Sequence, residues 1–206
     1  MLKKSRVYVI IDKDTAGKTC LTDIAKKIAK AKTAAFITQY RDKNSKREDI
    51  LKRALSLRKI LPKEKTLFII NDYIDIAKIS GCDGLHLGQK DLSIETARMI
   101  LGKDKIIGIS CHSLKQAKDA QRRGADYIGI GPVFSTPTKP DYKPIGLKEF
   151  KKIRQDIRIP FFAIGGINDK NIREVLNAGA NRVAVCRPAS TGNPAKNLDR
   201  LQNLIT

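Results

Sequence analysis

Residues 124–130 read GADYIGI, and closely similar segments occur at two other places in the chain. Residues 81–87 read GCDGLHL, and residues 179–185 read GANRVAV. In each copy, a glycine suited to end a helix in the left-handed conformation is followed by a short apolar strand. A helix that leads into a buried strand, repeated along the chain, is typical of proteins built from strand–helix units.

Apolar runs of strand length alternate with helical patterns from one end of the chain to the other. The runs are apolar almost throughout, which is typical of parallel strands covered on both faces. The predicted strands are residues 7–11, 35–39, 67–70, 84–87, 106–110, 127–130, 161–164 and 183–186. The predicted helices are residues 21–31, 46–60, 73–79, 93–101, 114–123, 147–156, 171–178 and 195–204.

Eight strand–helix units in 206 residues predict an α/β fold, a single (β/α)8 TIM barrel. The three similar segments fall at the fourth, sixth and eighth strands, every second unit, as the symmetry of a barrel suggests. No Pro/Gly/Ser-rich linker divides the chain, so we expect residues 1–206 to form one catalytic domain. The alternative architecture is an open, doubly wound sheet. In a barrel, the active site lies at the carboxyl ends of the strands.

The charge balance is strongly basic, with 41 Lys+Arg against 21 Asp+Glu and a net charge of +20. Such an excess raises nucleic acid as a partner. The basic residues are, however, scattered over the predicted polar faces of helices, and the chain has no Trp. We therefore expect a solvated basic surface, small-molecule substrates and no nucleic-acid site.

The apolar runs and the cysteines bear on location. No run approaches the roughly 20 residues of a membrane span, and the first residues lead into charge instead of an apolar signal core. The four cysteines are widely separated, which favours neither a disulfide framework nor a zinc site. We expect a cytoplasmic protein with no membrane partner.

Residues 16–19 read AGKT and follow a predicted strand, as the end of a phosphate-binding P-loop would. That motif needs a further glycine five residues before Gly17, where this chain has Asp12. Lys18 is therefore interpreted as a loop charge.

Polar side chains gather where the predicted strands end. By the period of two, Gln39, Arg41 and Lys43 share one face at the end of the second strand. The other candidates are Asn71 and Asp72 after the third strand, Asp91 after the fourth, Ser110 at the end of the fifth, Thr136, Thr138 and Lys139 after the sixth, Gly166 after the seventh and Arg187 after the eighth.

These groups suit the binding of a polyanion. The cations and short hydroxyls can hold phosphate oxygens, and the residues before the helix at Gly166 offer backbone N–H groups. Asp72 and Asp91 follow adjacent strands, which lie about 4.8 Å apart, so both could reach one Mg²⁺. Two alternatives stay open: Asp72 as a cap of the next helix, and Asp91 as a turn residue.

The order of these motifs resembles that of thiamine phosphate synthase along essentially the whole chain. The matching segments are Gln39-x-Arg41-x-Lys43, Asn71-Asp72, residues 84–91 (GLHLGQKD), residues 129–139 (GIGPVFSTPTK) and residues 163–167 (AIGGI). The resemblance implies a transferase that joins hydroxymethylpyrimidine pyrophosphate to thiazole phosphate with Mg²⁺. The products would be thiamine phosphate and pyrophosphate.

The resemblance also implies a role for each candidate. In that family the C–O bond to pyrophosphate is thought to break first, so neutralising the leaving group matters more than a nucleophile. We expect no catalytic Ser–His or Cys–His pair, and we interpret His86 as structural. The implied roles are Gln39, Arg41, Lys43 and Asn71 on the pyrimidine pyrophosphate, Asp72 and Asp91 on Mg²⁺, Ser110 on the pyrimidine or its pyrophosphate, Lys139 on the departing pyrophosphate, and Thr136, Thr138 and the N–H of Gly166 on the thiazole phosphate. Among these, Lys139, Arg41 and Ser110 are the expected catalytic residues.

The chain departs from the family pattern after the eighth strand. Cys186, Arg187 and Pro188 stand where the family usually has a hydrophobic residue, Ser and Ala. The Arg187 guanidinium could bind the thiazole phosphate directly or point outward. The rival functions are a related thiazole tautomerase, which keeps a histidine near His112, and a basic nucleic-acid-binding barrel.

Overall fold

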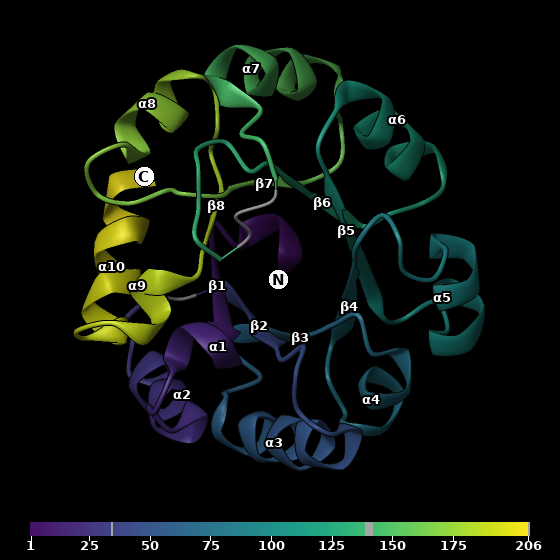
Figure 1. Ribbon diagram of the computed structural model, residues 1–206, viewed down its shortest axis with the longest axis vertical. Helices are drawn as coiled ribbons and strands as arrows, with labels where there is room; N and C mark the ends of the chain where they lie inside the picture. Colours follow the sequence, from purple (N-terminus) through teal and green to yellow (C-terminus); the bar gives the residue numbers. More distant parts are fainter. Residues whose placement is uncertain (34, 139–141, 206) are drawn as a thin grey trace.

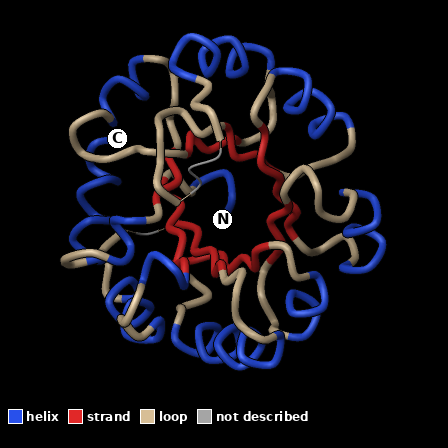
Figure 2. The backbone as a smooth tube through the Cα atoms, in the orientation of Figure 1, coloured by secondary structure: helices blue, strands red, loops and turns tan. Residues whose placement is uncertain are grey.

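Eight parallel strands close into a barrel in the computed structural model, which describes residues 1–33, 35–138 and 142–205. Each strand pairs with the next along the chain, and β8 returns to pair with β1. Figures 1 and 2 show the strands as an inner ring and the helices as an outer ring. The strands are β1 (Val7–Asp12), β2 (Phe36–Arg41), β3 (Thr66–Asn71), β4 (Gly84–Leu87), β5 (Ile106–Cys111), β6 (Tyr127–Ile130), β7 (Phe161–Ile164) and β8 (Val183–Val185).

The predicted single (β/α)8 barrel is confirmed, and the open sheet is wrong because β1 and β8 are hydrogen-bonded neighbours. All eight predicted helices form, and no predicted bound of a helix or strand differs by more than two residues from the structure. The helices are α2 (Leu21–Ala29), α3 (Arg47–Ile60), α4 (Ile74–Ile79), α5 (Ile94–Leu101), α6 (Leu114–Arg122), α7 (Gly146–Asp156), α8 (Ile172–Asn177) and α10 (Pro194–Ile205).

Three short helical segments were not predicted: η1 (Leu2–Lys4), α1 (Lys13–Ala16) and α9 (Arg187–Ser190). A single turn shows no periodicity, so its sequence carries no helical pattern. Helix α1 occupies the place of the rejected P-loop. The Asp12 side chain caps it by accepting a hydrogen bond of 2.8 Å from the Thr15 backbone N–H.

The alternation of side chains along each strand divides the core into two layers. On β1, Val7, Val9 and Ile11 pack outward against the helices. Tyr8 and Ile10 belong to a second, smaller cluster that fills the barrel interior together with residues of other strands. The other buried members of that cluster are Ile37, Ile69, Tyr127, Phe162 and Ala184.

The two ends of the barrel differ. The N-terminal turn η1 lies in the middle of the ring in Figure 1 and immediately precedes β1, so it covers the end where the strands begin. The carboxyl ends of the strands are left to form the site. Among the described residues, no helix is long and apolar enough to cross a membrane.

Candidate active site

A cavity of about 580 Å³ opens at the carboxyl ends of the strands, and a second cavity of about 360 Å³ adjoins it. We call them the larger and the smaller compartment. All predicted site residues that the structure describes line one or both of them. The wall shared by the two compartments consists of Arg41, Asn71, His86, Ser110 and Thr138.

The smaller compartment contains two carboxylates that interact with each other. Asp72 follows β3 with φ +61°, a left-handed conformation that Asp tolerates better than most residues. Its carboxylate pairs with the Lys43 ammonium, and its backbone N–H donates to the His86 carbonyl at 2.9 Å. Burial raises the pKa of Asp72, and the ion pair with Lys43 opposes this effect. The neighbouring Asp91 adds to the rise, so the pKa stays above its usual value.

The structure decides the two alternatives for these carboxylates. Helix α4 has Tyr73 at its N-cap and no side-chain cap, so the interpretation of Asp72 as a helix cap is wrong. Asp91 does form a turn, because its Oδ2 accepts a 2.6 Å hydrogen bond from the Gly88 N–H. Its carboxylate also reaches Asp72. Asp91 is therefore both a turn residue and part of the carboxylate pair.

The donor set of the smaller compartment fits Mg²⁺ held together with a phosphate substrate. The described residues contain no cluster of three or more His, Cys, Asp or Glu suited to a metal. Magnesium commonly takes only one or two carboxylates and completes its shell with water and substrate phosphate oxygens. Asp72 and Asp91 match that number. In the shared wall, the buried Nδ2 of Asn71 has no hydrogen-bond partner among the described residues, so it can donate to an oxygen of such a ligand.

Strand β2 ends in Arg41, the cation of the shared wall, and Lys43 follows it in the smaller compartment. The Arg41 guanidinium pairs with Asp12, a carboxylate only 1% exposed, which orients it at the end of β1. The residue between the two predicted cations, Asp42, faces the other way. It accepts hydrogen bonds of 2.9 Å from the Tyr40 hydroxyl and from Arg53 on α3. The period of two therefore separates the site residues from structural ones.

The structure brings a serine and a histidine together, a contact that the sequence analysis did not predict. His86 Nε2 lies 2.9 Å from Ser110 Oγ. The two residues are neighbours because His86 on β4 pairs with Gly108 on β5. Ser110 lies two residues beyond Gly108 and therefore on the same interior face of β5. The other ring nitrogen, Nδ1, meets the Tyr127 hydroxyl at 2.9 Å and not a carboxylate. The interpretation of His86 as structural does not account for its place in the lining of both compartments.

Two glycines shape the larger compartment. Gly165 and Gly166 follow β7 with φ +99° and +66°. A Cβ atom on Gly165 would lie 2.3 Å from the Pro132 Cβ, and one on Gly166 would lie 2.5 Å from the Ser135 carbonyl oxygen. The segment after β6 therefore approaches the β7 turn too closely for any side chain. This approach brings Thr136 and Thr138 of that segment to the same cavity.

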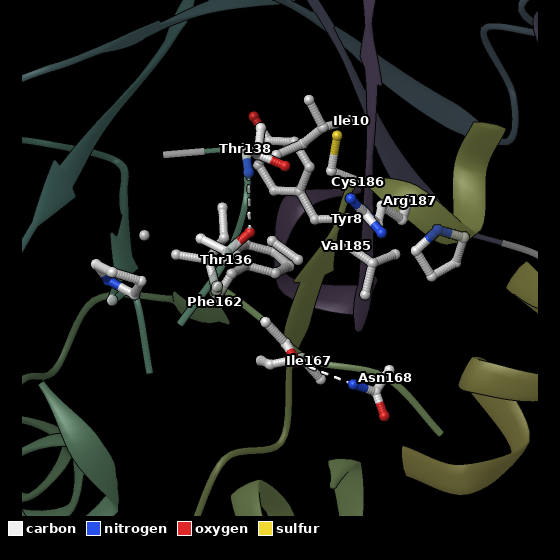
Figure 3. A pocket seen from close by; sticks show the side chains of 18 of the residues that line it. Tyr8, Ile10, Thr136, Thr138, Phe162, Ile167, Asn168, Val185, Cys186 and Arg187 are labelled. Atoms are coloured by element: carbon white, nitrogen blue, oxygen red, sulfur yellow. Dashed lines mark hydrogen bonds between the residues drawn. The ribbon is translucent and has the colours of Figure 1, made fainter. Parts of the chain in front are cut away.

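Figure 3 shows the larger compartment, including Cys186 and Arg187, which follow β8. The Cys186 thiol donates to the Thr15 hydroxyl at 3.5 Å, and burial raises its pKa to about 11, so it is a neutral thiol. Arg187 begins α9 and lines the cavity. Within the described residues, its guanidinium makes no hydrogen bond or ion pair. It is therefore available to an anion in the compartment.

Two further residues from the sequence analysis are Lys139 and His112. Lys139 lies outside the described residues. His112 lines the larger compartment, where its Nδ1 contacts the Gly131 carbonyl oxygen and its ring lies 4.8 Å from the Tyr142 ring. The sequence analysis missed Tyr8, which lines the cavity floor. Its inward position within β1 was the available signal, since a hydroxyl facing a barrel interior needs a polar partner.

Comparison with known proteins identifies relatives of this chain. The sequence profile of the family described as thiamine monophosphate synthase matches residues 7–189. The thiamine-phosphate synthase of Halalkalibacterium halodurans is 45% identical over 72% of this chain and 71% of its own. That of Clostridium acetobutylicum is 39% identical over 87% and 84%. The solved structure of thiamine phosphate pyrophosphorylase from Pyrococcus furiosus superposes with a TM-score of 0.87 and 32% identity. It covers 99% of this chain and 96% of that one.

Proposed function

The chain belongs to the thiamine monophosphate synthase family, and from this premise we propose how its two compartments divide the reaction. The protein is a transferase that condenses a pyrimidine and a thiazole moiety. We propose that the smaller compartment takes the pyrimidine pyrophosphate and the larger one the thiazole phosphate. The observation that carries this proposal is the shared wall, because two substrates in adjoining compartments meet there.

The pyrophosphate end would lie among the charged groups of the smaller compartment. Arg41 and Lys43 supply positive charge, and the unpartnered Asn71 Nδ2 donates to a phosphate oxygen. Asp72 and Asp91 would hold Mg²⁺, which neutralises pyrophosphate charge when bound. Without a cation, the two carboxylates would repel the substrate.

The thiazole phosphate end would lie in the larger compartment. The residues we assign to it share two properties: they line the cavity, and they offer hydrogen-bond donors. The Arg187 guanidinium can bind a phosphate through two parallel hydrogen bonds. The other donors are the Thr136 and Thr138 hydroxyls and the backbone N–H of Gly166.

The reaction depends more on neutralising the charge of the leaving group than on a strong nucleophile. As the C–O bond breaks, negative charge grows on the pyrophosphate, and preorganised donors stabilise it. We assign this role to Arg41 and Lys139, the latter from its sequence position alone. Ser110 would hold the pyrimidine substrate from the shared wall. The thiazole nitrogen then captures the pyrimidine cation, and no base is needed.

The proposal extends to the domain organisation, the partners and the location of the protein. We take residues 1–206 as one catalytic domain that binds small-molecule substrates and has neither nucleic acid nor a membrane as a partner. All four cysteines are free thiols, which suits a reducing compartment such as the cytoplasm.

The test is direct. Purified protein is mixed with both substrates and Mg²⁺, and thiamine phosphate and pyrophosphate are assayed. We expect equal amounts of both products, with none when either substrate is left out. Failure to form thiamine phosphate from folded protein and both substrates would overturn the proposal.

A further inference from the structure

Five side chains form one hydrogen-bond chain across the barrel interior. Gln39 Nε2 donates to the Tyr8 hydroxyl at 2.6 Å, and the Tyr8 and Tyr127 hydroxyls lie 2.8 Å apart. The Tyr127 hydroxyl meets His86 Nδ1, and His86 Nε2 meets Ser110 Oγ, both at 2.9 Å. The ends of this chain, Gln39 and Ser110, line the site, whereas its middle member, Tyr127, lines neither compartment.

The two tyrosines of the chain are almost completely buried, and Tyr8 also lines the floor of the larger compartment. Tyr8 is 2% exposed and Tyr127 is 0% exposed. Burial raises the pKa of both tyrosines well above the usual value, so each hydroxyl keeps its single proton. A buried hydroxyl proton needs an acceptor, since no water replaces one that is missing. The protons of the chain must therefore be arranged consistently from one end to the other.

Only one direction of proton donation along the chain gives every hydroxyl proton an acceptor when the Gln39 amide is oriented as in the structure. Gln39 Nε2 donates to Tyr8, so the Tyr8 proton goes to the Tyr127 oxygen. The Tyr127 proton then goes to Nδ1 of His86, and the imidazole carries its own proton on Nε2, from which it donates to Ser110. With the Gln39 amide in this orientation, the opposite direction leaves the Tyr8 proton without an acceptor among the described residues. Turning the amide over would permit that opposite direction.

We propose that this chain sets the hydrogen-bond polarity of the pyrimidine site and that Tyr127 is a positioning residue. The proposal rests on the proposed function. Ser110 Oγ already accepts from His86, so its hydroxyl proton is offered to the substrate. The Gln39 nitrogen is held by Tyr8, so its Oε1 is offered as an acceptor. The site thus presents an acceptor at one end and a donor at the other.

This polarity selects an aminopyrimidine. An amino group donates to Gln39 Oε1, and an acceptor atom of the same substrate receives the Ser110 proton. An oxo group in place of the amino group would set a carbonyl oxygen against Gln39 Oε1, with no proton between them. A site built around hydrogen bonds discriminates strongly against a ligand of the wrong pattern, because buried polar groups are then left unpaired.

The proton arrangement has a direct readout that does not depend on activity. The chain has only two histidines, so ¹⁵N NMR of the imidazoles gives two sets of signals, and a His112→Gln variant assigns them. We expect His86 of the substrate-free protein to be neutral, with the proton on Nε2 and Nδ1 unprotonated. A proton on Nδ1 would overturn the proposed direction.

The functional test removes the middle of the chain. Tyr127→Phe deletes one buried hydroxyl that touches no substrate. We expect the KM for the pyrimidine pyrophosphate to rise about tenfold, the effect of about one lost hydrogen bond. The KM for thiazole phosphate should stay within about twofold. The preference for the amino over the oxo pyrimidine pyrophosphate should fall, and the Nε2–H form of His86 should lose its predominance.

The matched control is Tyr40→Phe. Tyr40 is also a buried tyrosine, at 1% exposed, but its hydroxyl donates to Asp42 on the helix-facing side of β2. This variant should lose thermal stability without a change in either KM or in the amino preference. The proposal is overturned if Tyr127→Phe behaves like Tyr40→Phe while the parent protein makes thiamine phosphate. Absence of product from the parent would instead count against the proposed function, and the NMR result would still stand.

Discussion

Gly108 on β5 lies opposite Tyr127 on β6, and only the lack of a side chain on the glycine leaves room for the tyrosine ring. A Cβ atom on Gly108 would lie 2.0 Å from Cζ of Tyr127. The glycine therefore admits the central member of the buried hydrogen-bond chain into the barrel interior.

Gly108→Ala should destabilise the protein by about 1–3 kcal/mol, because the fully buried Tyr127 ring has no open space to move into. The free energy of unfolding in urea measures this effect. Gly129→Ala is the matched control on the neighbouring strand, where a Cβ would make an ordinary contact of 3.6 Å with His86. Equal loss in the two variants would contradict the explanation by ring overlap.

Activity should require Mg²⁺, because the interacting carboxylates of Asp72 and Asp91 would otherwise repel the pyrophosphate. EDTA should abolish turnover, and added Mg²⁺ should restore it. Asp72→Ala should raise the Mg²⁺ concentration for half-maximal rate at least tenfold, while Asp75→Ala, at an exposed ion pair with Arg47, should not change it. Full turnover in EDTA would remove the metal from the reaction.

Arg187 should contribute to binding of the thiazole phosphate. A charge-assisted, bidentate contact is worth about 1.5–3 kcal/mol, so Arg187→Ala should raise the KM for thiazole phosphate about 10- to 100-fold. The KM for the pyrimidine pyrophosphate should stay nearly constant. Arg187→Ser should cost less, because a hydroxyl can donate in its place. Steady-state kinetics with each substrate varied decides this. Values within about twofold of the parent for both variants would place the guanidinium outside the site.

Lys139 should act on the departing pyrophosphate. Lys139→Ala should lower both kcat and kcat/KM, because the interaction strengthens as the C–O bond breaks. Lys148→Ala, on α7, provides the control for loss of one positive charge outside the cavities. A change confined to KM would make Lys139 a residue that binds the ground state only.

Asp42 should stabilise the fold in a pH-dependent way. Burial acts to raise its pKa, but hydrogen bonds from Tyr40, Ser45 and Asn44 outweigh this effect and lower it below the usual value. A lowered carboxyl pKa adds stability that is present above the unfolded-state pKa of about 4 and is lost as the pH falls through the folded-state pKa.

Asp42→Asn should therefore cost about 2 kcal/mol at pH 7. The difference from the parent should shrink towards pH 3. Urea unfolding at several pH values measures it, with Asp23→Asn, at an exposed ion pair, as the control. A loss that is independent of pH would show that the carboxylate charge is not involved.

The sequence alone determined the barrel and many of the residues that line its cavities. Parallel strands buried on both faces must be apolar throughout, so each of the eight strands is visible as a local run. Each apolar run is followed by polar residues, which mark the end of the strand. Because the strands are parallel, the residues that follow them all lie at the same end of the barrel. The period of two separated Arg41 from Asp42 without any knowledge of their partners. Such properties depend on residues close together in the chain.

Only the tertiary structure decided which of these residues touch. The contacts of Ser110 with His86 and of Asp72 with Asp91 depend on how neighbouring strands and their loops meet. The hydrogen-bond chain from Gln39 to Ser110 crosses the barrel interior and joins side chains of five strands. Register and the angle at which a side chain enters the barrel are set by packing between distant segments, and no local pattern records them. One-turn helices such as α9, which carries Arg187, cannot be predicted from the sequence pattern either, because a single turn is too short to show a helical period.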